Sequence, residues 1–154
     1  MKGWLHASLI AGAVVLVAAL AVVLFLSTRR RDRRDECRFH LMRMHNALAA
    51  AAPATAREWD HAPKGRAFWE RSDDWPGARI PFDRRDLACP VLDRPTGSDY
   101  RGPAASYRAL GPDDPIAADR DGNHLERGNV LLKSGTIVEA DERLWTRAAK
   151  TTAD

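Results

Sequence analysis

The longest uninterrupted apolar stretch of the chain is its strongest constraint on folding. From Ala7 to Leu26 no residue carries a formal charge, and Ser8 is the only polar side chain. At about 1.5 Å per residue, a helix of this length spans roughly 30 Å, the thickness of the hydrocarbon core of a bilayer. A signal peptide has a shorter apolar region, of about 7–15 residues, followed by small residues at a cleavage site. We therefore predict an uncleaved transmembrane helix over residues 7–26, behind a short flank of residues 1–6.

Positive charge is concentrated beside this run. Lys2 and the five arginines between Arg29 and Arg34 hold six of the 24 basic residues, and Asp32 is one of the 21 acidic residues. Residues 35–154 are left with 18 basic and 20 acidic residues, a net charge of −2. A nucleic-acid-binding domain carries its basic patch on the folded surface, so we expect no nucleic-acid partner. We expect the basic collar, residues 29–34, to contact anionic lipid headgroups of the membrane, each charge contributing about 1 kcal/mol.

The helix is predicted to continue beyond the membrane, over the collar and on to residue 52. Residues 27–52 contain neither Pro nor Gly, and Pro53 disfavours helical geometry at the residue before it. An apolar stripe follows steps of four, three, four and three residues, which is one face of a helix: Cys37, Leu41, Met44, Leu48 and Ala51. This stripe must pack against the rest of the domain.

The C-terminal part predicts a β-hairpin over residues 130–138. Two β-prone runs flank Ser134-Gly135, where Gly adopts a positive φ at no steric cost. A polar loop from Asp119 to Gly128 precedes the hairpin, and residues 141–150 predict a terminal helix.

The residues around this hairpin resemble the C-terminal signature of a family of membrane-anchored, pilin-like bacterial proteins. In that family Asn-His leads through a Gly-rich loop and Asn-Val-Leu to Asp-Gly, with nine residues between His and Asp-Gly. Here nine residues separate His124 from Ser134-Gly135, Asn129 begins the Asn-Val-Leu run, and Ser134 replaces the Asp. Cys37 with its Leu- and Ala-striped helix, and Cys89-Pro90 followed by Ser-Tyr and Gly-Pro, resemble the family in the same order.

The resemblance implies an α+β, pilin-like fold. A long N-terminal helix, half of it transmembrane, would pack on a small antiparallel β-sheet within residues 53–154. The implied role is that of a non-enzymatic pseudopilin-like component or accessory of a type II secretion or type IV pilus-like assembly. Its partners would be other pilin-like or secretion-system subunits, at the inner (cytoplasmic) membrane, with the domain on the exported side. The family's cleavage signature, Gly followed by Phe-Thr-Leu-Ile-Glu, is replaced here by Gly3-Trp4-Leu5-His6-Ala7-Ser8.

Two other function classes stay open. The positive-inside rule places the basic collar in the cytoplasm, which favours a membrane-anchored interaction or regulatory domain facing that side. A metal-dependent hydrolase would use His124 with Asp119 or Asp121. Neither a phosphate-binding Gly-rich loop nor a nucleophile elbow is present in the sequence, so we predict no enzymatic activity.

The chain has two cysteines, Cys37 and Cys89. In an exported domain the simplest prediction is one disulfide, closing a loop of roughly 50 residues and contributing about 4 kcal/mol by the loop-entropy relation. The alternative is a pair of unrelated buried thiols in a cytosolic domain.

The polar loop offers candidate metal ligands. Asp119, Asp121 and Asn123 occupy alternate positions, like the start of an EF-hand, but the twelfth position is Val130 where that motif requires Glu. A looser calcium site, as in some pseudopilins, and simple turn formation by Asp and Asn are the two interpretations. By resemblance, His124 fixes the loop onto the hairpin, together with Asn129, Ser134 and Gly135 as structural motif residues.

Residues 53–86 show no sustained period of two or 3.6 residues. Trp59, Phe68, Trp69, Trp75 and Phe82 alternate with Pro, Gly and charged residues. We interpret them as aromatics that pack over a small core, with an aromatic binding surface as the alternative.

Overall fold

The computed structural model describes residues 2–51, 58–72, 75, 83–92, 98–120 and 128–154. The chain divides into two compact units, Met1–Arg34 and Asp35–Asp154. Helix α1, Lys2–Ala51, supplies the first unit and continues into the second. It is described as far as Ala51, and the predicted boundary at residue 52 lies outside the described residues.

In the first unit the apolar side chains of α1 that the structure describes, from residue 13 on, are exposed. Val15, Val17 and Val23 each expose about two thirds of their surface (68%, 67% and 65%). By length and composition α1 is a helix able to cross a membrane, with a mean hydropathy of 2.2 in its most apolar part. The structure thus confirms the coarser part of the prediction, a helix long and apolar enough to cross a membrane.

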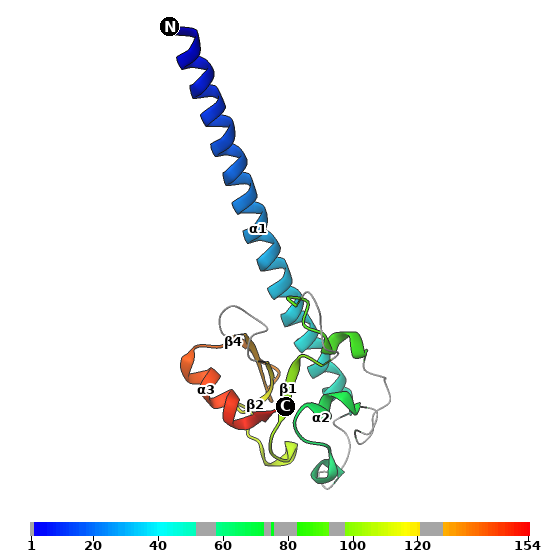
Figure 1. Cartoon of the computed structure of the whole chain (residues 1–154). Coiled ribbons are helices and arrows are strands. Elements are labelled where there is room, and N and C mark those ends of the chain that lie inside the picture. Colours follow the sequence, from blue (N-terminus) through cyan, green and yellow to red (C-terminus); the bar gives the residue numbers. More distant parts are fainter. Residues whose placement is uncertain (1, 52–57, 73–74, 76–82, 93–97, 121–127) are drawn as a thin grey trace. The chain divides into compact units, whose positions relative to one another are not determined.

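The second unit contains a five-stranded antiparallel sheet, with β1 at Tyr100–Pro103, β2 at Pro115–Asp119, β3 at Asn129–Leu132, β4 at Ile137–Glu139 and β5 at Thr152–Ala153. The strand order is β4-β3-β2-β1-β5. Figure 1 labels β1, β2 and β4 of this sheet. β3 and β4 form the hairpin, in which Val130 pairs with Val138 and Leu131 with Ile137. The predicted α+β layout, a long helix with a small antiparallel sheet, is confirmed.

The two faces of the sheet contribute to two different cores. Successive side chains of a strand point to opposite faces. Accordingly, Leu131 packs in a core with the apolar stripe of α1, whereas its neighbours Val130 and Leu132 pack with helix α3, Glu142–Thr151. Ala148 is the fully buried residue of α3, and Leu144 and Trp145 are partly buried beside it. The sheet therefore lies between the second half of α1 and α3.

The larger core holds the stripe predicted on α1. Its five members are all buried: Cys37, Leu41, Met44, Leu48 and Ala51. Aromatic side chains from the middle of the chain complete this core, with Phe68 and Trp69 on the short helix α2, Arg66–Glu70. Trp59 on the 3-10 helix η1, Glu58–His61, packs with Phe68 and Trp75, at ring-centroid distances of 6.2 and 6.4 Å. These aromatics serve as core; Phe82 lies outside the described residues.

Candidate functional site

Four polar or thiol side chains meet in the larger core, and we call them the thiol–carboxylate cluster: Cys37, Cys89, Tyr100 and Asp119. All four are buried, with at most 1% of their surface exposed. Cys37 comes from the inward face of α1, and Tyr100 and Asp119 are register partners on β1 and β2. Cys89 follows the 3-10 helix η3, Arg84–Leu87.

The segment that carries Cys89 is attached to α1 by polar contacts. The Nδ1 atom of His40 lies 3.0 Å from the carbonyl oxygen of Ala88, and Nη1 of Arg43 donates to Oδ1 of Asp86 at 3.0 Å. The backbone N–H of Cys89 donates to Oδ2 of Asp99 at 2.9 Å. The two contacts from α1 come from the turns that follow Cys37, and together with the contact to Asp99 they hold the second thiol beside the first.

Asp119 is held by both the helix and the neighbouring strand. The thiol of Cys37 donates to its Oδ1 at 3.3 Å, and the backbone N–H of Asn129 donates to its Oδ2 at 2.6 Å. A Cβ added at Gly128 would lie 2.3 Å from that same Oδ2. Gly128 therefore leaves the space that the carboxylate occupies.

The cluster opposes ionisation of its own thiol and phenol. The pKa of Cys37 is raised far above its usual range, first by its hydrogen bond with Cys89, then by burial and by the negative charge of Asp119. Burial raises the pKa of Tyr100, and the neighbouring Cys37 and Asp119 add to the effect. Both groups are therefore neutral near pH 7, and neither serves as a ready nucleophile.

Two kinds of chemistry suit this arrangement. The Sγ atoms of Cys37 and Cys89 and a carboxylate oxygen of Asp119 all lie within 4.8 Å of one another. The sulfur atoms of a disulfide lie about 2.05 Å apart. The two thiols would therefore have to move closer by less than about 3 Å to form one. Thiolates and a carboxylate are also zinc ligands, although a structural zinc site normally has four. In the structure both cysteines are thiols and no disulfide joins them, so the predicted bond stays a prediction.

The structure describes only part of the predicted metal-ligating set. Asp121 and Asn123, and with them His124, lie outside the described residues. Asp119 is described, and it is turned into the core toward Cys37 and Asn129. The calcium site therefore stays a prediction.

Three residues of the predicted hairpin motif, Asn129, Ser134 and Gly135, lie in or between strands β3 and β4. Asn129 begins β3 and pairs with Glu139. At the turn, Gly135 has a φ of +91° and its N–H donates to the carbonyl oxygen of Leu132 at 2.9 Å. Ser134 donates through Oγ to Thr136 Oγ1 at 3.2 Å. A Cβ at Gly135 would lie 2.5 Å from Cε1 of His45, so the hairpin turn contacts α1 closely.

Sequence reasoning paired Cys37 with Cys89 but missed Tyr100 and Asp99. Both lie in the stretch Ser98–Tyr100, which carries no periodic pattern, and both act through partners on other elements. Their positions depend on the pairing of β1 with β2, and no local sequence pattern predicts that pairing.

Comparison with known proteins gives no relative. No family model matches the chain, and no curated protein or solved structure matches it significantly.

Proposed function

We propose that the chain is a non-enzymatic, single-pass membrane protein of the pilin-like type, a pseudopilin-like component or accessory of a type II secretion or type IV pilus-like assembly. The observation that carries the proposal is that the two halves of α1 have different surroundings. Its first half exposes an apolar surface, and its second half buries a regular stripe against an antiparallel sheet. The resemblance of the hairpin motif, His124 with Ser134-Gly135, supports the same proposal.

The proposed mechanism is mechanical. The apolar half of α1 holds the subunit in the membrane, and the folded unit presents surfaces to other subunits. On α1 itself, Phe39 and Met42 remain 46% and 42% exposed. They lie on the face of the helix opposite the buried stripe, where a neighbouring pilin-like subunit could cover them.

The proposal places the folded unit on the exported side, with a disulfide between Cys37 and Cys89. The proximity of the two thiols in the core supports the bond. Its formation removes two protons and two electrons from the pair, which a protein disulfide of an oxidising compartment accepts by thiol–disulfide exchange. The bond would join α1 to the segment after η3.

A cytoplasm-facing interaction or regulatory domain is the second candidate. The observation in its favour is the basic collar, because Lys2 is the only charged side chain on the other side of the apolar run. In that case both cysteines would stay reduced.

Orientation is tested with an introduced thiol, because the native cysteines are buried. Ala149 is exposed on α3, and Ala149→Cys in intact cells should react with a membrane-impermeant maleimide. Lys2→Cys is the matched control and should react only after the membrane is opened. The reverse pattern would overturn the exported side and favour the regulatory domain.

Assembly is tested by photo-crosslinking in the membrane. A photoreactive amino acid at Met42, which is exposed, should give crosslinks to pilin-like subunits or to a second copy of the chain. The same substitution at Phe39 should do so too, whereas one at Arg143, exposed on α3, is the control for random collision. Equal yields at all three positions would contradict the proposed subunit surface on α1.

A further inference from the structure

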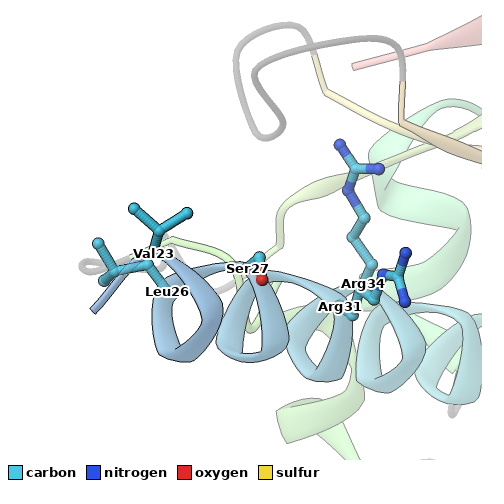
Figure 2. A pocket seen from close by; sticks show the side chains of 5 residues that line it. All are labelled: Val23, Leu26, Ser27, Arg31 and Arg34. Carbon is cyan, nitrogen blue, oxygen red and sulfur yellow. The ribbon is translucent and has the colours of Figure 1, made fainter. Parts of the chain in front are cut away.

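A pocket of about 360 Å³ lies along one face of α1, where the apolar run meets the basic collar (Figure 2). The described residues that line it belong to the first unit: Val23, Leu26, Ser27, Arg31 and Arg34. The two apolar side chains stand at one end, the two arginines at the other, and Ser27 between them. The pocket therefore changes from apolar to cationic along the helix axis.

Helical spacing explains why these residues share a face. Val23, Ser27, Arg31 and Arg34 follow one another at steps of four, four and three residues. At about 1.5 Å per residue, Arg31 lies roughly 6 Å farther along the axis than Ser27. The apolar end of the pocket thus falls inside the predicted span of residues 7–26, and the cationic end falls at headgroup depth.

The chemistry of the pocket matches one kind of ligand. Val23 and Leu26 expose 65% and 50% of their surface, which gives an acyl chain an apolar wall. The hydroxyl of Ser27 is neutral and donates to the carbonyl oxygen of Leu24 at 2.8 Å. The positive charge among the described lining residues therefore comes from the guanidinium groups of Arg31 and Arg34. Guanidinium groups bind phosphate oxygens by paired, charge-assisted hydrogen bonds. A phosphate joined to an acyl chain satisfies both ends.

We propose that this face of α1 binds one anionic phospholipid, with its phosphate at Arg31 and Arg34 and its acyl chain along Val23 and Leu26. This differs from the general attraction of a basic collar, which depends only on the number of charges near the surface. The inference rests on the anchoring by α1 proposed above. It holds whether the folded unit lies on the exported side or in the cytoplasm. It therefore makes a prediction that depends on the helix face.

The collar supplies its own matched control. Arg29 and Arg33 carry the same charge, but at 100° per residue they lie on a different side of the helix from Arg31 and Arg34. The guanidinium of Arg29 lies over the ring of Phe25, 5.5 Å from its centroid. Removing these two charges or the pocket pair changes the net charge equally.

The test is native mass spectrometry of the full chain in mild detergent, titrated with phosphatidylglycerol or phosphatidylcholine. The wild type should retain one phosphatidylglycerol at least tenfold more tightly than phosphatidylcholine. Arg31→Gln with Arg34→Gln should lose this preference tenfold, whereas Arg29→Gln with Arg33→Gln should keep it within about twofold. The expected amounts in the membrane fraction are equal for all three proteins.

Equal losses in the two double variants would overturn the site and leave only attraction by net charge. Equal binding of both lipids by the wild type would overturn it as well. If the chain were absent from the membrane fraction, the anchoring itself would fail, and this outcome is separate from the other two.

Discussion

The thiol of Cys37 donates a hydrogen bond of 3.3 Å to Oδ1 of Asp119, so a residue of α1 and the last residue of β2 meet inside the core. The other carboxylate oxygen accepts the backbone N–H of Asn129, the first residue of β3. One buried carboxylate thus links a helix and two strands that are distant in the sequence.

Replacing Asp119 should therefore destabilise the folded unit. Asp119→Ala leaves the N–H of Asn129 without its acceptor in the core, and we expect a loss of about 1–3 kcal/mol. Asp119→Asn keeps one carbonyl oxygen for that N–H and should lose less. Asp60→Ala, at an exposed carboxylate near Arg108, is the control and should change stability by under about 0.5 kcal/mol. Denaturant unfolding of the full chain in detergent measures all three, and equal stability of Asp119→Ala and wild type would contradict the role of the carboxylate.

The oxidation state of the cysteine pair should control stability. With Cys37 and Cys89 joined, the protein should be more stable than the Cys37→Ser, Cys89→Ser double variant by roughly 4 kcal/mol. Reductant added to the unfolded protein should remove the advantage, while leaving the double variant unchanged. Thiol counting under denaturing conditions gives an independent readout. Two titratable thiols together with bound zinc would instead assign the thiol–carboxylate cluster as a metal site.

The turn of the hairpin should not tolerate a side chain. Gly135→Ala introduces a Cβ at a positive φ and 2.5 Å from the ring of His45, which should cost about 1–3 kcal/mol. His45→Ala removes the ring and should rescue part of this loss, because only the backbone strain remains. A double-mutant cycle measures the coupling. Additive effects of the two substitutions would show that the turn and α1 do not touch in solution.

Truncating an aromatic side chain should destabilise the protein strongly at Phe68, in the core, and only weakly at Phe39, on the outer face of α1. Phe68 is fully buried, with its ring centroid 4.9 Å from that of Trp69 and 5.2 Å from that of Trp75. Phe68→Ala should cost about 3–5 kcal/mol. Phe39→Ala, at a half-exposed phenylalanine, should cost under about 1 kcal/mol. Thermal unfolding of the two variants would contradict the assignment of the core if their losses were alike.

The stability of the folded unit should depend on Asp114 in acid. The backbone N–H of Gly111 donates to the carboxylate of Asp114 at 2.7 Å. This hydrogen bond, followed by the one from Arg147, holds the pKa of Asp114 below its usual value. A lowered folded pKa gives stability that is present above the unfolded pKa and is lost as the pH falls through the folded value. The melting temperature of the wild type should therefore be higher than that of Asp114→Asn between pH 5 and 7, and this difference should shrink below about pH 4. Melting temperatures across this range test it, and a constant difference would refute it.

Local signals predicted the parts of the fold that depend on local sequence. The stripe from Cys37 to Ala51 has the helical period, and all five of its members are buried on α1. The hairpin has a turn Gly between two β-prone runs, and β3 and β4 pair across it. These features follow from backbone preferences and periodicity, which operate within a few residues.

The strands that complete the sheet were not predicted, and their sequences explain this. β1 contains both Gly102 and Pro103, and β2 is buried along its whole length and so lacks alternation. Their pairing places Tyr100 opposite Asp119 and thereby assembles the cluster around Cys37. Sequence composition identified the two cysteines as partners, but their polar neighbours depend on strand register.

Because Leu131 of β3 faces α1, the core over the α1 stripe cannot be completed until β3 has been synthesised. Leu131 closes the core over the stripe of α1, yet it is made 80 residues after Ala51. At roughly 5–20 residues per second, this interval lasts about 4–16 s. During that time the stripe, including Cys37, has no completed sheet to cover it. Both thiols are buried in the finished fold, so an enzyme that oxidises them reaches them most readily in the seconds before β3 and β4 cover the stripe.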